Sequence, residues 1–153
     1  MTERSVEEVL ARYPRDFIDR DTFPMFEGFL ARRLLINRCQ DCGQFFQPPW
    51  PSCPNCWSDD VTPTEVSGKG IVHTFVILHT GALMGVEGID YARGHPLAVI
   101  QLEEQDGLRV TGPIVNCPLD DIRIGMPVTL TWVEREGALV PAFQPRSKEG
   151  MDT

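Results

Sequence analysis

The sequence contains no long run of apolar residues: no stretch approaches the roughly 20 that a membrane-spanning helix requires. It also has neither GxxxxGK[ST] nor a GxGxxG that opens a helix, which argues against nucleotide hydrolysis and dinucleotide binding. The N-terminus shows no basic segment followed by an apolar one, so we expect the protein not to be exported. These absences favour a cytoplasmic protein without a membrane partner.

Positive charge is scarce as well. The 153 residues include 14 Lys and Arg against 22 Asp and Glu, a formal net charge of −8. Residues 39–68 contain no Lys or Arg, and their acids are Asp41, Asp59, Asp60 and Glu65. Because a nucleic-acid-binding surface needs basic groups to neutralise phosphates, we expect no nucleic-acid partner.

Four of the five cysteines form two CxxC pairs separated by ten residues: Cys39, Cys42, Cys53 and Cys56. Two such turns can close around one metal ion, and four thiolates complete a tetrahedral zinc shell that leaves no position for water. The pattern therefore predicts one structural zinc ion. A disulfide framework or a thioredoxin-like redox pair fits the paired, proline-rich spacing less well. Cys117 is interpreted as a small buried residue without a catalytic role.

Helical signals precede the cysteines. Ser5 followed by Glu8 is a capping box and predicts a short helix that Pro14 ends. Thr22 as N-cap and Pro24 in the first turn predict a second helix that runs to about Arg32. The apolar side chains of this arm exceed what a small ribbon can bury. We expect at least one helix to face a partner, with packing inside the chain as the alternative.

Strand signals follow. Residues 34–36 and 45–46 are expected to flank the first cysteine pair, and the ribbon is expected to end near Trp57. Within 69–78, alternation places Ile71, His73, Phe75 and Ile77 on one face of a strand and Val72, Thr74, Val76 and Leu78 on the other. Together with later runs at 96–102, 108–115, 127–133 and 138–144, and a short turn at 118–121, this predicts a five-stranded Greek-key barrel of the OB type. An open sandwich is the alternative.

The chain is therefore predicted to be mainly β, in four parts. These are an N-terminal helical arm (1–33), a rubredoxin-like zinc ribbon (34–67), an OB-fold (68–146) and a disordered tail (147–153). The segment between residues 80 and 94 is too long for a hairpin turn and contains both Gly and apolar residues: Leu83, Met84, Val86, Ile89 and Tyr91. We expect this loop to order against a partner or an acyl chain, with a flexible surface loop as the alternative.

Several motifs in this order resemble one known family. They are CxxCG at 39–43, FxPP at 46–49, CPxC at 53–56, EVSGKGIV at 65–72 and IRIGMPV at 122–128. The chain is similar, from about Phe23 to Pro145, to the acyl-CoA-associated zinc-ribbon/OB-fold proteins, long catalogued as a domain of unknown function. One departure is Trp57, where glycine is common, and it affects only the local turn.

The resemblance implies an accessory subunit of a thiolase-like enzyme, that is, a thiolase, aldolase or acyltransferase. In such a hetero-oligomer the partner supplies the catalytic residues, and the small subunit supports assembly and the acyl-CoA site. A subunit of a MaoC-type enoyl-CoA hydratase complex is the alternative, and a nucleic-acid-binding module fits the acidic chain less well. If acyl-CoA is contacted, its phosphates need basic groups, for which the candidates are Arg32, Arg33, Arg38, Lys69 and Arg93; ordinary solvated side chains are the alternative. No catalytic residue is assigned, and His73 is interpreted as structural.

Overall fold

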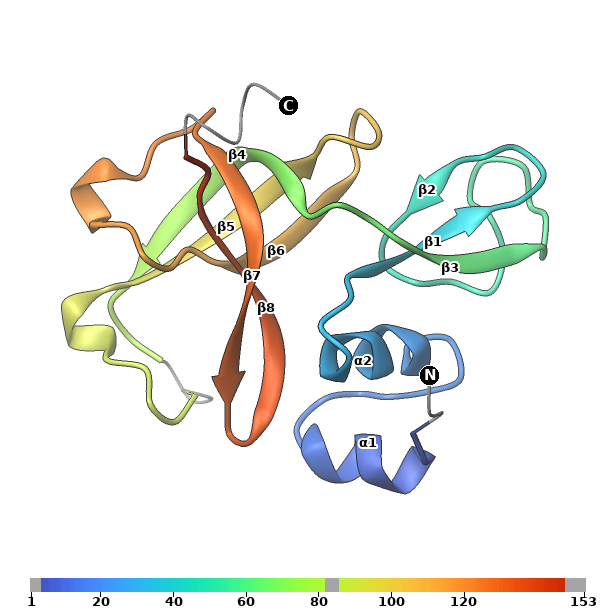
Figure 1. The fold of residues 1–153 in the computed structure, drawn as a ribbon, viewed down its shortest axis with the longest axis horizontal. Helices are drawn as coiled ribbons and strands as arrows, with labels where there is room; N and C mark the ends of the chain where they lie inside the picture. Colours follow the sequence, from blue (N-terminus) through green and yellow to red (C-terminus); the bar gives the residue numbers. More distant parts are fainter. Residues whose placement is uncertain (1–3, 82–85, 148–153) are drawn as a thin grey trace. The chain divides into compact units, whose positions relative to one another are not determined.

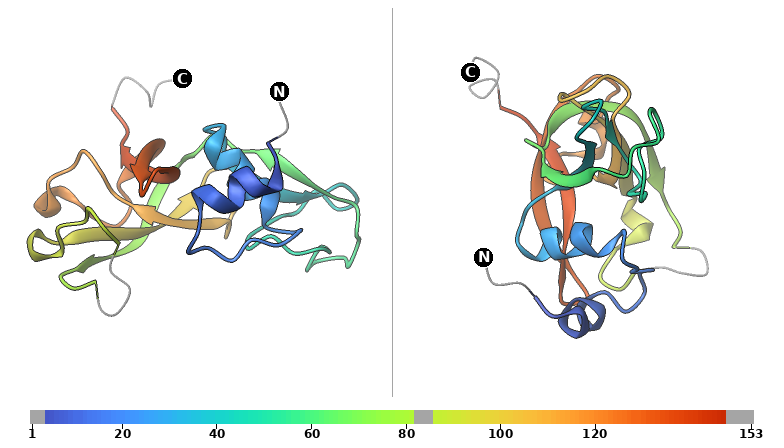
Figure 2. Two further views of the ribbon diagram at one scale, coloured as in Figure 1. Left: turned by 90° about the horizontal axis from the view of Figure 1, so that it is seen from below. Right: turned by 90° about the vertical axis from the view of Figure 1, so that its right-hand side faces the viewer.

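The computed structural model describes residues 4–81 and 86–147, which divide into two compact units. The first unit comprises the N-terminal part through Ser67 together with Glu136–Val140, and the second comprises Gly68–Arg135 and the chain from Pro141. Figures 1 and 2 show the elements of each. Among the described residues, no helix has the length and apolar character needed to cross a membrane.

Two short helices begin the first unit. Helix α1 (Val6–Arg12) starts at Ser5, whose hydroxyl accepts a hydrogen bond from the Glu8 N–H at 3.2 Å, as the capping box predicted. Helix α2 (Phe23–Leu30) ends before Arg32, not at it. The Arg33 N–H donates to the Gly28 carbonyl at 2.8 Å and Arg32 is left-handed at φ 57°, which is a Schellman stop.

The inner faces of the helices share an aromatic core. Tyr13 and Phe26 have ring centroids 4.9 Å apart, and Phe26 and Phe29 lie 5.5 Å apart. The Tyr13 hydroxyl donates to the Leu139 carbonyl at 2.5 Å, and burial raises its pKa to about 12, so it remains a donor at neutral pH. Packing within the chain, the alternative considered above, therefore accounts for α2. Helix α1 leaves Val6 and Leu10 exposed.

The ribbon is a three-stranded antiparallel sheet in the order β2-β1-β3. Strands β1 (Leu35–Cys39) and β2 (Phe45–Phe46) agree with the prediction. Strand β3 (Val61–Glu65) pairs with the whole of β1 and brings Val61 opposite Cys39. The ribbon sheet therefore continues past Trp57, near which its end was expected, but stays within the expected bounds of 34–67. The sequence of β3 gives little sign of a strand, because Pro63 interrupts it and its register depends on a distant partner.

The second unit is a nearly closed five-stranded antiparallel barrel in the order β6-β5-β4-β7-β8. Its strands are β4 (Lys69–Leu78), β5 (His95–Leu102), β6 (Arg109–Pro113), β7 (Pro127–Arg135) and β8 (Ala138–Pro145), of which residues 138–140 count with the first unit. A parallel bridge between Ile114 and Phe143, with the Val115 N–H donating to the Phe143 carbonyl at 2.8 Å, joins the two edges. The predicted OB-type barrel is confirmed, and the open-sandwich alternative is wrong.

Strand β4 departs from the predicted alternation. Its pairing with β5 shifts register between Val72 and Thr74, so His73 and Thr74 are both exposed. Up to Val72 the predicted faces hold, and beyond the bulge they do not, because one extra residue reverses the alternation. Such a bulge lets a long strand curve around a small barrel.

Two predicted features lie partly outside the described residues. Leu83 and Met84 of the long loop are outside, so its ordering against a partner stays a prediction. The described part contains the short 3-10 helix η2 (Tyr91–Arg93), and the Val86 N–H donates to the Tyr91 hydroxyl at 3.3 Å. Residues 148–153 of the predicted disordered tail are also outside. A second 3-10 helix, η3 (Leu119–Asp121), occupies the predicted turn before β7.

A glycine at the start of the barrel gives a test of its packing. Gly68 has φ 76°, and a Cβ built there would lie 2.3 Å from the Leu130 Cβ. We expect Gly68→Ala to destabilise the protein by about 1 kcal/mol from the left-handed backbone and about 1–3 kcal/mol more from overpacking. Gly107 has φ 80° with nothing within 4 Å of its Cβ position, so Gly107→Ala carries only the backbone cost. Denaturant unfolding of both variants measures the difference; equal losses would contradict the packing argument.

Candidate metal centre

The first cysteine pair forms a tight turn at the end of β1. The Gly43 N–H donates to the Cys39 carbonyl at 2.9 Å, and the Cys39 N–H donates to the Gln44 carbonyl at 2.9 Å. Gly43 supplies the left-handed conformation, φ 77°, that closes such a turn. Both thiols of this knuckle thereby face the same side.

The second pair repeats this geometry without a preceding strand. The Trp57 N–H donates to the Cys53 carbonyl at 2.9 Å, and the Cys53 N–H donates to the Ser58 carbonyl at 2.8 Å. Trp57 takes the left-handed place that Gly43 has in the first knuckle, at φ 66°. The turn that glycine usually makes is therefore preserved despite the substitution.

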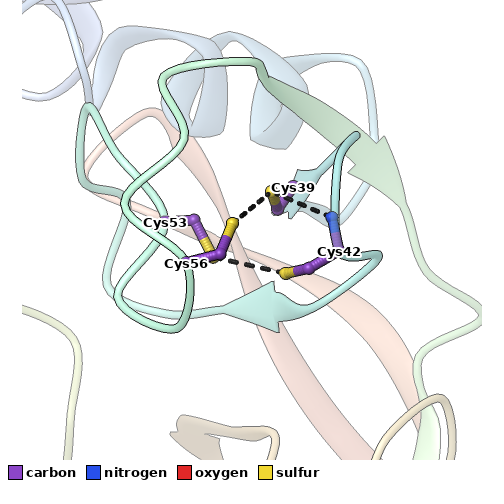
Figure 3. Close-up of side chains that lie close together, drawn as sticks. All are labelled: Cys39, Cys42, Cys53 and Cys56. Atoms are coloured by element: carbon purple, nitrogen blue, oxygen red, sulfur yellow. Dashed lines mark hydrogen bonds between the residues drawn. The ribbon is translucent and has the colours of Figure 1, made fainter.

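The two knuckles bring four sulfur atoms together (Figure 3). All four Sγ atoms lie within 4.8 Å of one another, and the Cys39–Cys56 and Cys42–Cys53 Sγ pairs are each 3.6 Å apart. In a tetrahedron with Zn–S bonds of about 2.3 Å, sulfur atoms lie about 3.8 Å apart. The donor set and its spacing thus fit one zinc ion, and the distances are too long for disulfides.

The site is half enclosed. Cys39 and Cys53 are buried and pack with Phe46 and Val61, while Cys42 and Cys56 face solvent. This cluster is too small to hold the ribbon together by apolar burial alone. A metal ion bound by all four sulfurs would supply the missing stabilisation and, with no free coordination position, would be structural rather than catalytic.

The sulfur cluster shifts the pKa values of its two exposed thiols in opposite directions. Hydrogen bonds from the Gln44 backbone and then the Asn55 side chain lower the pKa of Cys42 to about 6. The pKa of Cys56 rises to about 12: the Ser58 backbone lowers it, but the neighbouring Cys39 thiol, desolvation and the other two thiols outweigh that effect. Four adjacent thiolates need a cation between them, so metal binding releases protons and weakens as the pH falls.

Three residues around the sulfurs were missed by the sequence reasoning. The Asn55 amide donates to the Cys42 sulfur of the other knuckle at 3.6 Å, and its N–H donates to Cys53 at 3.4 Å. The Ser58 hydroxyl donates to the Asp41 carboxylate, a second link between the knuckles. Their place inside or beside the CxxC pairs was the available signal, because polar residues there are within reach of thiolates.

The five candidate phosphate contacts fall in two units, with Arg32, Arg33 and Arg38 in the first and Lys69 and Arg93 in the second. Arg33 pairs with Glu65 at 3.2 Å, and Arg93 pairs with Asp90 at 3.2 Å. Arg38 lies 5.0 Å above the Phe45 ring and donates to the Gly43 carbonyl. Arg32 is exposed at the end of α2.

Lys69 and Arg93 lie near opposite ends of β4, since Leu78 pairs with His95. A strand of this length spans about 30 Å, so Lys69 and Arg93 cannot both contact one phosphate group.

Replacing one ligand tests the metal centre. In isolated zinc-finger peptides, metal binding is worth about 10–16 kcal/mol and is largely folding energy. We therefore expect Cys39→Ser to lose the metal and unfold the ribbon. Cys117 is only half-buried and stands outside the cluster, so Cys117→Ser should keep one zinc and wild-type stability. Native mass spectrometry and thermal unfolding measure both; a metal-free Cys39→Ser protein with an unchanged Tm contradicts a structural role.

Two family models match adjoining parts of the chain, which together cover residues 26–133. The model described as "ChsH2, rubredoxin-like zinc ribbon domain" matches residues 26–62, and "ChsH2, C-terminal OB-fold domain" matches residues 63–133. They cover the cysteine cluster and most of the barrel.

Curated relatives fall into two groups. The "Probable enoyl-CoA hydratase alpha subunit" of Thermomonospora curvata is 35% identical over 145 residues, 94% of this chain and 43% of that protein. The "3-oxo-4,17-pregnadiene-20-carboxyl-CoA hydratase alpha subunit" of Mycobacterium tuberculosis is 30% identical over 129 residues, 82% of this chain and 38% of that protein. The chain thus spans about two-fifths of these relatives. A "DUF35 domain-containing scaffold protein" of Methanocaldococcus jannaschii is 34% identical over 96 residues, 62% of this chain and 64% of that protein.

One solved structure is similar over nearly its whole length. It is named "Ltp2-ChsH2(DUF35) aldolase", and it matches with a TM-score of 0.74 and 35% identity over 86% of this chain and 98% of that chain. A DUF35-family structure from Sulfolobus solfataricus, at 14% identity and a TM-score of 0.58, shares the fold. The chain therefore belongs to the ChsH2/DUF35 family of zinc-ribbon and OB-fold proteins, the family that its motifs resemble.

Proposed function

We propose that the chain is the zinc-ribbon/OB-fold subunit of an acyl-CoA enzyme complex, in which it supports assembly and the acyl-CoA site while a partner carries the catalytic groups. The observation that carries this proposal is the 35% identity to the ChsH2(DUF35) chain of a structure named as an aldolase with Ltp2. An aldolase is one of the thiolase-like enzymes that the motifs imply. The complex is proposed to act in the cytoplasm, where thiolate ligands stay reduced.

The helical arm offers a docking surface for such a partner. An open groove of about 430 Å³ is lined by four apolar and two charged residues: Val6, Leu10, Ile18, Phe23, Asp19 and Arg20. Val6 is 58% exposed, and Phe17 nearby in sequence is 82% exposed. Exposed apolar surface of this kind usually marks an interface. We propose that this groove receives apolar side chains of the enzyme subunit.

A hydratase complex is the second candidate. It is favoured by the names of the relatives from Thermomonospora curvata and Mycobacterium tuberculosis, both hydratase alpha subunits. Because this chain spans about two-fifths of each, the region they share is proposed to contribute the same ribbon and barrel to a different enzyme. The two candidate functions differ only in the partner enzyme, so identifying the subunit that binds this chain distinguishes them.

We further propose Arg32 as the best placed of the five candidate contacts to a CoA phosphate. It lies on the surface in the turn that ends α2, and its left-handed φ of 57° is unusual for a residue with a side chain. Arg33, Arg38 and Arg93 can contribute only by giving up or sharing the contacts described above. Lys69, at the start of β4, is retained as a contact from the second unit.

Co-purification tests the assembly. The tagged chain is expressed with the thiolase-like subunit, or with the hydratase subunit, encoded beside it. A stable hetero-oligomer by light scattering is expected with one of them. Val6→Asp should weaken that complex about tenfold or more, because a charge would be buried in the interface, while an acid at the first turn of α1 leaves the helix stable.

Ile124→Asp is the matched control, because Ile124 is 68% exposed but lies in the second unit, in the turn before β7. It should leave the affinity unchanged. A chain that stays monomeric beside both subunits and leaves their activity unaltered contradicts the proposed function.

Calorimetry with CoA tests the phosphate contact in the assembled complex. Arg32→Gln should weaken CoA binding about 3- to 10-fold, since one charged contact is lost. Arg15→Gln, at another exposed arginine of the same unit that lies outside the docking groove, serves as control and should have no effect. An affinity unchanged by Arg32→Gln would favour a scaffold that does not touch CoA through this residue.

A further inference from the structure

The two metal knuckles have the same backbone geometry but different residues at the closing position. Gly43 closes the first at φ 77°, and Trp57 closes the second at φ 66°, each donating its N–H to the carbonyl of the first cysteine at 2.9 Å. Glycine adopts this conformation freely, whereas a residue with a Cβ incurs about 1–2 kcal/mol. Trp57 thus holds a strained conformation that glycine would relieve.

The Trp57 side chain gives the fold little in return for this strain. It is 79% exposed, the most exposed tryptophan of the chain, so its ring buries little apolar area within the protein. Strained backbone positions and exposed large apolar groups both cluster at functional sites. Tryptophan is also among the residues that most often dominate the binding energy of protein interfaces.

The surroundings of the indole are anionic. Asp59 and Asp60 follow it after Ser58, and Asp41 is held beside its knuckle by the hydrogen bond from Ser58. All three carboxylates are exposed, and residues 39–68 contain no Lys or Arg. A bound zinc tetrathiolate would add a charge of about −2. An indole within negative potential favours a cation over its face.

From these observations we propose that Trp57 anchors a protein interface, and that its partner presents an apolar pocket rimmed by arginine or lysine on the acyl-CoA enzyme subunit. This inference rests on the proposed function. A second copy of the chain is the poorer occupant, because two anionic ribbons would repel, and nucleic acid is repelled for the same reason. Trp57 supplies the buried contact, and the three carboxylates steer the encounter.

Trp57→Gly separates binding from folding. Because glycine fits the left-handed position, the variant should keep one zinc and have an equal or higher Tm. Its complex with the enzyme subunit should be about 30-fold weaker, the loss expected for an interface hot spot. The double variant Asp59→Asn/Asp60→Asn should slow association and make the association rate less dependent on salt between about 50 and about 300 mM NaCl. Ile124→Ser, at an apolar side chain that is 68% exposed in the turn before β7, should bind like the wild type.

The outcomes separate the two proposals. If the wild-type chain binds and Trp57→Gly binds within about twofold of it, the Trp57 site is wrong and the proposed function stands. If Trp57→Gly and Ile124→Ser lose equal affinity, the effect is general loss of apolar surface and the site is also wrong. If the isolated chain self-associates and Trp57→Gly abolishes that self-association, the partner at Trp57 is a second copy of the chain and not the enzyme subunit. A wild-type chain that binds no enzyme subunit removes the proposed function, and this site with it.

Discussion

The ribbon depends on the electrostatics of four sulfur atoms held within 4.8 Å of one another. Thiolates this close repel one another unless a divalent cation lies between them. The apolar cluster beneath them consists of Phe46 and Val61 with the two buried cysteines, which is too little to fix a sheet. The fit to zinc therefore explains how so short a segment has a defined fold.

The same constraint organises the chain around the knuckles. Cys39 is the last residue of β1, so the strand that follows α2 ends directly in the metal shell. Strand β3 pairs back along β1 and places Val61 opposite Cys39. Asn55 and Ser58 add hydrogen bonds between the knuckles. A defect at one sulfur is thus transmitted to the three-stranded sheet, because the ligands and the strands are continuous in sequence.

Features set by neighbouring residues could be predicted from sequence, and features set by distant partners could not. The α1 cap at Ser5, the cysteine cluster and the barrel strands follow from local spacing. Strand β3 was missed because its pairing with β1, not its own residues, makes it a strand. The bulge after Val72 likewise depends on β5. Among the basic candidates, Arg33 is paired with Glu65, 32 positions away, which no local pattern reveals.

The closing turns of the two knuckles show that the metal site tolerates Trp57 at a position where glycine would be unstrained. The backbone hydrogen bonds of the Trp57 turn match those of the Gly43 turn, so the strained φ is imposed by the surrounding geometry, not by the residue. Strain of about 1–2 kcal/mol is small beside the binding energy of a structural zinc ion. A tetrathiolate site can therefore carry an exposed tryptophan at a glycine position without losing its fold. The rigid metal turn also fixes the backbone from which the indole projects, so no backbone entropy is lost at this position on binding.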